Sequence, residues 1–270
     1  MHFDPTFRDD VWHAKFWAQA MLDLALPAPG HYGEVQIVQK VSQTASIFNR
    51  QLLLSTPVQW TLAYEGATLW MSDTPQERLM MLAGTTGMHG HVLVAGGGLG
   101  LYPQYLWRYQ RATRITLVER HPDIVAMLRA TLSPCLNIEI VHEAFEHFIA
   151  HCHKQHFDSC YIDIHPTLDP QWLPGLNWLR NQCSAAVTGP LRIWGYQWMV
   201  GELVSGLMRE YIPLLRKGQY FATDLGRDVA HALPKHWQCW SVTRLRSWLT
   251  AYAYQVAWPL TMPAFVGHPL

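Results

Sequence analysis

Short apolar runs alternate with amphipathic segments through the middle of the chain. Four of these runs are expected to be strands: Val92–Val94, Ile115–Val118, Asn137–Val141 and Phe157–Ile162. Helix-compatible segments separate them, at 101–109, at 123–132 and from Glu143 onward. Apolar, β-branched runs are typical of buried parallel strands, and strand–helix alternation is typical of α/β sheets. The pattern therefore predicts a Rossmann-like α/β fold, with a mostly parallel sheet and helices on both of its faces.

The N-terminal quarter has a different pattern. A helical repeat of apolar residues covers 8–25 and ends before the proline- and glycine-containing segment 27–30. Strand-like pieces follow at 34–41, 46–54, 60–64 and 68–71, and the last two flank the hairpin signal Glu65-Gly66. We therefore predict an N-terminal helix within 1–30, a small β-hairpin domain at 31–73 and a Rossmann-like domain at 74–270.

The C-terminal third is less regular. It offers a fifth strand at 191–196, a long helix at 198–217 that is interrupted near Pro213, and a sixth strand at 220–223. A further helix at 241–254 carries apolar residues on one face. We find no pattern for a seventh, antiparallel strand.

A glycine-rich loop lies between the first two strands of the predicted parallel sheet. Its glycines are Gly96, Gly97, Gly98 and Gly100, and the next strand ends in Glu119, which lies 21 positions after Gly98 (119 − 98). Strand, glycine turn, helix, strand and acid form a nucleotide-binding βαβ unit, in which the acid meets ribose hydroxyls. A glycine turn that binds no ligand remains the alternative.

The glycine spacing discriminates between nucleotide classes. A dinucleotide loop, G-x-G-x-x-G, needs its third glycine at position 101 or 103, where this chain has Leu101 and Pro103. A P-loop is excluded because no Gly-Lys-Ser/Thr follows. The observed pattern is G-x-G-x-G.

This pattern, with an acid closing the next strand, resembles motif I and its partner acid in class I S-adenosylmethionine-dependent methyltransferases. It also resembles the GGG-x-G loop of spermidine synthases, which share that fold, and the resemblance covers roughly residues 34–200. It implies S-adenosylmethionine as cofactor, bound by the four loop glycines and Glu119. It also implies adenine binding by Glu143, which follows the third strand; the alternative for Glu143 is an acid favoured at a helix N-terminus.

Asp163 and His165 directly follow the fourth strand. Ligands of open α/β sheets lie beyond the carboxyl ends of the strands, so these two residues face the expected site of chemistry. The resemblance implies the same, since catalytic groups of methyltransferases and aminopropyltransferases sit at this strand end. The alternative is a purely structural role, in which Asp163 caps the loop and His165 is a turn residue.

Asp73 and Glu77 lie where the β-hairpin domain meets the next helix. Thr74, Pro75 and Glu77 have the spacing of a capping box, and we expect Glu77 to be a helix cap. The resemblance to the gate of spermidine-synthase-type enzymes instead implies substrate binding by Asp73 and Glu77. Its usual Tyr-His-Glu is replaced here by Arg-Leu-Met at 78–80.

Composition narrows the class of protein. Lys+Arg and Asp+Glu are both 20, so no net charge draws the chain to nucleic acid or to an anionic membrane. The five cysteines form no C-x-x-C pair, the N-terminus has no apolar signal core, and no apolar run approaches 18 residues. These features predict a cytoplasmic protein without membrane spans.

A metal site is not expected. His147 and His151 have i, i+4 spacing, but no H-E-x-x-H motif is present, so we interpret them as a solvated helix face.

The leading function is methyl transfer from S-adenosylmethionine to a small-molecule acceptor. Aminopropyl transfer from decarboxylated S-adenosylmethionine is the alternative, although Leu99 replaces the aspartate that is typical of that loop in spermidine synthases. A catalytically idle nucleotide-binding protein is third, and a nicotinamide-dependent oxidoreductase is fourth because the third glycine is missing. A homodimer is left open.

Overall fold

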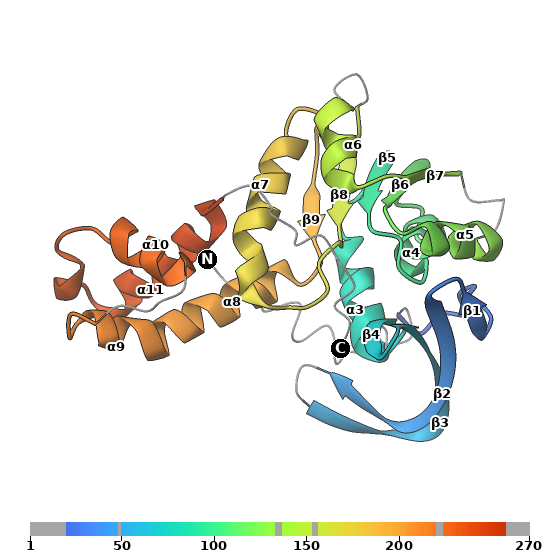
Figure 1. The fold of residues 1–270 in the computed structure, drawn as a ribbon, viewed down its shortest axis with the longest axis horizontal. Coiled ribbons are helices and arrows are strands. Elements are labelled where there is room, and N and C mark those ends of the chain that lie inside the picture. Colours follow the sequence, from blue (N-terminus) through green and yellow to red (C-terminus); the bar gives the residue numbers. More distant parts are fainter. Residues whose placement is uncertain (1–19, 48–49, 133–136, 153–155, 220–223, 258–270) are drawn as a thin grey trace. The chain divides into compact units, whose positions relative to one another are not determined.

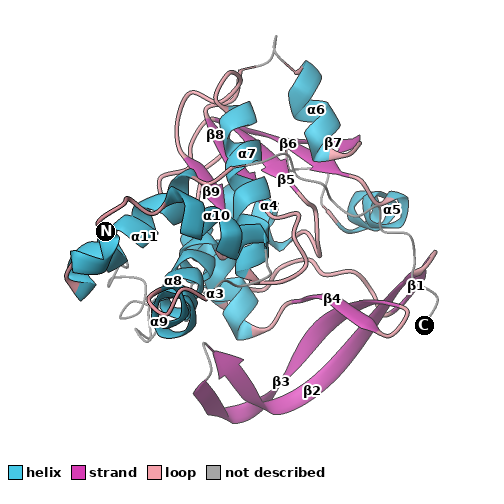
Figure 2. Cartoon of the chain, turned by 60° about the vertical axis from the view of Figure 1, so that its left-hand side comes forward, coloured by secondary structure: helices cyan, strands magenta, loops and turns pink. Residues whose placement is uncertain are grey.

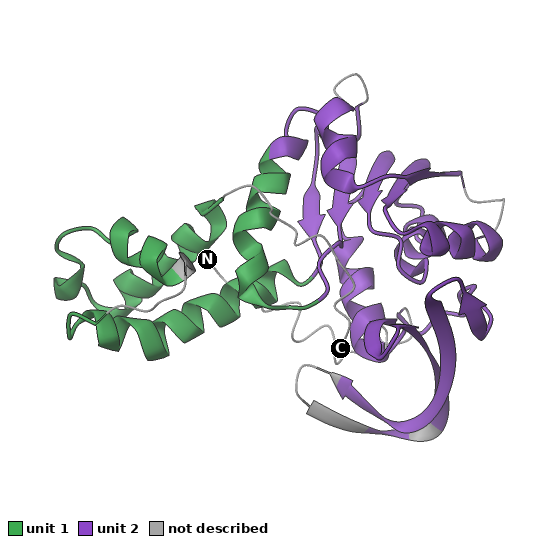
Figure 3. Cartoon of the chain, in the orientation of Figure 1, with its two compact units in different colours: residues 1–3, 167–181, 195–270 green, residues 4–166, 182–194 purple. Residues whose placement is uncertain are grey.

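The computed structural model describes residues 20–47, 50–132, 137–152, 156–219 and 224–257. The chain divides into two compact units (Figure 3). Unit 1 comprises residues 1–3, 167–181 and 195–270, and unit 2 comprises residues 4–166 and 182–194. Most of the predicted helix at 8–25 and all of the predicted strand at 220–223 lie outside the described residues.

Unit 2 contains a five-stranded parallel sheet (Figure 1). Its strands are β5 (His91–Ala95), β6 (Arg114–Glu119), β7 (Ile138–His142), β8 (Ser159–Ile162) and β9 (Leu191–Ile193). They are arranged in the order β7-β6-β5-β8-β9, and every neighbouring pair is parallel. The predicted Rossmann-like fold of the class I methyltransferase type is therefore confirmed. The order reverses between β5 and β8, and in such sheets this switch point is where ligands bind.

Helices cover both faces of this sheet. One face packs against α3 (Pro75–Gly84), α4 (Leu101–Arg108) and α5 (Pro122–Thr131), and their apolar side chains form one core with alternate residues of β5 and β6. The other alternate residues are also buried, and α6 (Phe145–His151) packs on their side through Phe148, whose ring lies 6.4 Å from that of Phe157. Burial on both faces explains why the central residues of these strands are apolar, with Thr116 as the exception.

The predicted N-terminal β appendage is a four-stranded antiparallel sheet in the order β1-β2-β3-β4. Its strands are β1 (Gly30–Tyr32), β2 (Val35–Ile47), β3 (Arg50–Glu65) and β4 (Thr68–Ser72), and β2 and β3 form a long curved ribbon (Figure 2). The short strand-like pieces of the sequence thus join into two long strands.

The appendage is not a separate body. Val35, Ile37 and Ala63 belong to the same apolar core as α3 and β5, and the Glu34 backbone N–H donates a 2.9 Å hydrogen bond to Asp123 at the start of α5. Packing therefore places the predicted 31–73 domain in one compact unit with the parallel sheet.

Unit 1 is helical, and this differs from the single domain predicted for 74–270. It contains most of α7 (Leu173–Cys183), then α8 (Tyr196–Gly206), α9 (Ile212–Leu215), α10 (Asp224–Ala232) and α11 (Val242–Gln255), with short 3-10 turns at Pro170–Trp172 and Trp237–Cys239. The sequence did not predict α7 or α10.

The predicted long helix at 198–217 is a continuous helical path with a π turn at Leu207–Tyr211. Pro213 lacks an N–H and crowds the preceding turn, which is a physical cause of such a distortion. Within unit 1, buried Asn177 links α7 to the end of α11, because its side-chain amide donates hydrogen bonds to the carbonyls of Ala253 (2.9 Å) and Val256 (2.8 Å). None of the described helices is long and apolar enough to span a membrane.

Candidate functional site

The glycine loop and Glu119 meet at the carboxyl edge of the parallel sheet. Glu119 ends β6 and is 9% exposed. One carboxylate oxygen accepts a 2.8 Å hydrogen bond from the Gly97 N–H, and the other accepts one of 2.8 Å from the His121 N–H. Glu119 therefore joins the glycine loop to the turn after β6, and each of its oxygens retains a free lone pair.

Gly96 and Gly98 have left-handed backbone conformations, with φ of +89° and +53°. A Cβ at Gly96 would lie 1.9 Å from the carbonyl oxygen of Asp163, so the first turn of the loop passes directly beside the end of β8. The nearest neighbour of a Cβ at Gly98 would be the flexible Met71 thioether, at 2.9 Å. Glycine at 96 is thus required by the protein itself, whereas Gly98 borders a movable side chain.

Asp163 and Glu77 bring two acids together at the switch point. The Asp163 N–H donates a 2.8 Å hydrogen bond to the Ala95 carbonyl, which fixes the end of β8 against β5. Burial raises the pKa of the Asp163 carboxyl well above its usual range, and the negative charges of Glu77 and Glu119 raise it further. Burial also raises the pKa of Glu77 to about 7. Part of each residue's surface remains exposed, but these pKa shifts follow from the desolvation of the carboxyl groups themselves.

The predicted capping box does not form. Thr74 is at the N-cap and Pro75 begins α3, as expected, but Thr74 makes no side-chain capping bond and its hydroxyl lies 3.0 Å from that of Ser72. Glu77 instead lies close enough to Trp194 for the indole to lower the pKa of its carboxyl, and close enough to Asp163 for its own charge to raise the pKa of that carboxyl. Interpreting Glu77 as a cap was therefore wrong, because the tertiary fold gives its carboxyl a buried environment beside β8 and β9.

Several buried polar atoms around these acids lack a hydrogen-bond partner within the described chain. They are the Tyr161 hydroxyl, the Trp194 indole nitrogen and both ring nitrogens of His165. The indole N–H lies near enough to Glu77 to oppose the rise of its pKa, but it does not reach hydrogen-bond geometry. Buried polar groups are almost always satisfied by protein, water or ligand, so these atoms are available to form hydrogen bonds with water or with a ligand.

His165 is 5% exposed and its ring centroid lies 5.2 Å from that of Trp194. Burial lowers the pKa of His165 to about 4, and a backbone interaction with Trp194 opposes this shift. The ring is therefore neutral at pH 7 and is a weaker base than the Asp163 carboxylate or the Glu77 carboxylate. The structure thus brings the two predicted catalytic residues into one cluster but distinguishes their acid–base properties.

Glu143 follows β7 as the sequence indicated. Its N–H donates a 3.0 Å hydrogen bond to the Glu119 carbonyl, and its carboxylate lies 3.5 Å from His151 Nε2. The backbone next to Glu119 therefore positions Glu143, and adenine binding by its side chain stays a prediction.

Asp73 has a different environment. It is 1% exposed, accepts a hydrogen bond from the Thr61 N–H, and forms a 3.0 Å ion pair with Arg78, which is 7% exposed. These contacts tie β3, β4 and α3 together. Substrate binding by Asp73 remains an untested expectation, and its carboxylate is already engaged by the protein.

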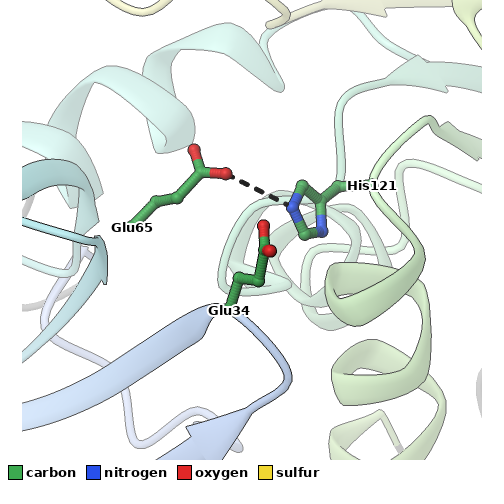
Figure 4. Close-up of side chains that lie close together, drawn as sticks. All are labelled: Glu34, Glu65 and His121. Carbon is green, nitrogen blue, oxygen red and sulfur yellow. Dashed lines mark ion pairs between the residues drawn. The ribbon is translucent and has the colours of Figure 1, made fainter. Parts of the chain in front are cut away.

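Glu34, Glu65 and His121 form a separate polar group (Figure 4). One potential ligand atom from each lies within 4.8 Å of the others, and His121 Nε2 is 3.7 Å from a Glu65 carboxylate oxygen. His121 Nδ1 accepts a 3.2 Å hydrogen bond from the Asp123 N–H, so the neutral ring carries its proton on Nε2, facing Glu65. A metal at Nε2 would have to displace this proton and disrupt the helix cap. We therefore interpret the group as a polar contact between the β appendage and the turn after β6.

Sequence reasoning missed Tyr161 and Trp194. Tyr161 is an inward-facing residue of β8 whose ring stacks on Tyr102 at 3.7 Å, and Trp194 directly follows β9. Trp194 lay inside the strand predicted at 191–196, so the sequence did not show that it follows β9 at the edge of the sheet where ligands bind. The hydroxyl of Tyr161 had no such signal, because strand tyrosines are usually core residues.

Comparisons with known proteins add little beyond the fold. No protein-family model matches the chain, and no curated protein matches its sequence. Human methyltransferase-like protein 13 in complex with SAH has 17% identity and a TM-score of 0.30, over 41% of this chain and 56% of that one. A spermidine synthase in complex with the transition-state analogue AdoDATO has 14% identity and a TM-score of 0.33, over 55% of this chain and 53% of that one.

The spermidine synthase from Thermotoga maritima has 11% identity and a TM-score of 0.32, over 62% of this chain and 64% of that one. The chain therefore spans only 53% to 64% of the length of these three proteins. At such TM-scores the fold assignment rests on the strand order and on the position of the glycine loop.

Proposed function

We propose that this protein transfers a methyl group from S-adenosylmethionine to a small-molecule acceptor. The observation that carries the proposal is the Glu119 carboxylate, which holds the glycine loop at the switch point of the parallel sheet. A loop without side chains beside an acid at the end of the next strand is the arrangement that binds a nucleoside in this class of sheet.

The residues present fit such a cofactor. Within the described residues each Glu119 oxygen accepts one backbone N–H, so both oxygens can accept a further hydrogen bond from a ribose diol. Leu101 and Pro103 replace the third glycine of a dinucleotide loop and disfavour NAD(H). When bound, the cofactor would supply an electrophilic methyl group on a sulfonium.

The chain's own contribution is positioning and proton transfer. The Asp163 and Glu77 carboxyls have raised pKa values, so either can take a proton from an acceptor that loses one during the reaction. Neutral His165 and the indole N–H of Trp194 offer hydrogen bonds that orient an uncharged part of the acceptor. Alignment of the reacting groups would supply most of the rate enhancement.

One observation favours the aminopropyltransferase alternative. The negative charge of Glu77 acts on Asp163, and neither acid forms an ion pair in the described chain. Such a pair would also suit a cationic amine. The methyl-transfer proposal is retained because Leu99 removes an acid from the glycine loop.

Calorimetric titration tests the cofactor. S-adenosylmethionine and S-adenosylhomocysteine should bind, and NADH should not. Glu119→Ala should weaken binding by about 1.5–3 kcal/mol, the scale of a hydrogen bond to a charged group. Glu139→Ala is the matched control, because that glutamate is half-exposed on β7 and forms an ion pair with Arg114. NADH binding without binding of either sulfur nucleoside would refute the proposal.

A product assay separates the two transfer reactions. Decarboxylated S-adenosylmethionine and putrescine are supplied together, and the release of methylthioadenosine with spermidine is measured. No spermidine is expected. Its formation would replace methyl transfer by aminopropyl transfer as the function.

A further inference from the structure

Glu77 and Asp163 are partly exposed, but their carboxyls are desolvated and lie close enough for the charge of Glu77 to act on Asp163. Neither residue takes part in an ion pair in the described chain, and the strongest charge effects on Asp163 come from two other acids, Glu77 and Glu119. The nearby arginine of α3, Arg78, is engaged by Asp73. Buried carboxylates without a counter-charge are unfavourable, so this pair requires protons or a cationic ligand.

The groups that face the pair come from four elements. Glu77 belongs to α3, Tyr161 and Asp163 to β8 and its end, Trp194 to the end of β9, and Tyr102 of α4 stacks on Tyr161. The hydroxyl of Tyr161, which is 1% exposed, and the ring nitrogens of His165 have no partner in the described chain. Together these groups form a polar surface with two acids. The exposed Arg192 of β9 lies close enough for its charge to lower the pKa of Tyr102, but the charges that raise the pKa of Asp163 are those of acids.

We propose that this cluster binds a positive charge brought by the cofactor's sulfonium group, and that cofactor binding releases a proton from the Glu77–Asp163 pair to solvent. This inference rests on the proposed function, and it adds that the site distinguishes the cationic sulfonium from the neutral thioether of the product. The position supports it, since the glycine loop touches the end of β8 at Gly96.

The sign and size of the effect follow from Glu77. Its pKa of about 7 leaves it half-protonated near neutral pH, and a neighbouring sulfonium would favour its charged form. The deprotonated fraction is about 1/11 at pH 6 and about 10/11 at pH 8. The affinity for S-adenosylmethionine should therefore be about tenfold higher at pH 8 than at pH 6, while the affinity for S-adenosylhomocysteine should lack this increase.

Isothermal titration calorimetry at pH 6, 7 and 8, in buffers of different ionisation enthalpy, measures both affinity and proton release. At pH 7 we expect release of about half a proton or more with S-adenosylmethionine, beyond that seen with S-adenosylhomocysteine. Glu77→Gln should remove the difference and also serves to subtract ionisation of the ligand's own amino group. Glu139→Gln, on the exposed side of β7, should preserve it.

The outcomes separate this inference from the proposed function. Binding of both nucleosides with the same pH profile and the same proton count would overturn the inference and leave the function standing. The same holds if Glu77→Gln keeps the wild-type difference. Failure of both nucleosides to bind at any pH would overturn the function and the inference together.

Discussion

Replacing Asp73 by asparagine should destabilise unit 2 substantially without acting on catalysis directly. The carboxylate has two partners, the Thr61 N–H and the Arg78 guanidinium. Asparagine offers one acceptor oxygen in place of two, so one donor loses its partner and faces an NH2 group. The substitution also leaves the charge of Arg78 buried without a counter-charge.

The magnitude follows from these contacts. Breaking a buried ion pair by removing one partner costs about 3–5 kcal/mol. Arg78 keeps hydrogen bonds to the carbonyls of Asp73 (3.1 Å) and Leu22 (2.7 Å), so we expect a loss near the lower end, about 3 kcal/mol. Glu139→Gln breaks the ion pair between Glu139, which is 54% exposed, and Arg114, which is 52% exposed. This exposed pair should contribute less than about 1 kcal/mol to the free energy of unfolding.

Urea unfolding monitored by circular dichroism measures both variants, and Arg78→Met completes a double-mutant cycle. The double variant should lose clearly less than the sum of the two single variants, because removing both charges leaves none unpaired. A loss below about 0.5 kcal/mol for Asp73→Asn would refute the buried pair. Normal stability with a raised acceptor KM would instead assign Asp73 to substrate binding.

Two further predictions concern the loop and the histidine. Gly96→Ala should abolish cofactor binding and lower the melting temperature, because its Cβ would lie 1.9 Å from the Asp163 carbonyl oxygen. Gly87→Ala is the control for backbone conformation alone, since Gly87 has a φ of +78° and a Cβ there would have no neighbour within 4 Å. Equal losses of melting temperature for the two variants in scanning fluorimetry would contradict the steric argument. Because the pKa of His165 is lowered to about 4, the unfolded chain takes up its proton first, and this histidine should reduce stability as pH falls from 6.5 to 4. Glu77 acts oppositely, since its raised pKa adds stability that is present below 4.5 and lost as pH rises through about 7. The test uses a Glu77→Gln background and measures how far the urea midpoint drops between pH 7 and pH 4.5. This drop should be smaller after His165→Gln than before it. An unchanged drop would show that His165 is not buried as a neutral ring.

Local chemistry in the sequence determined the frame of this protein. Val92–Val94 and, apart from Thr116, Ile115–Val118 are apolar on both faces because helices cover both sides of their strands, so apolar runs identified the parallel sheet. The glycines at 96, 98 and 100 all adopt positive φ, and this backbone requirement can be recognised in the sequence because glycine adopts it most readily. The spacing from Gly98 to Glu119 followed from the length of one βαβ unit, which placed the acid against the loop at Gly97.

Tertiary structure alone decided which polar side chains meet. Glu77 has the local pattern of a helix cap, yet its environment is set by β8 and Trp194, which lie far away in sequence, so desolvation outweighs the local signal. The sequence around Asp73 is compatible with substrate binding, and only the fold shows that its carboxylate is hydrogen-bonded to Thr61 and paired with Arg78. Likewise, the division that separates residues 195–257 from the sheet depends on long-range contacts such as those of Asn177 with the end of α11, which no periodicity in the sequence encodes.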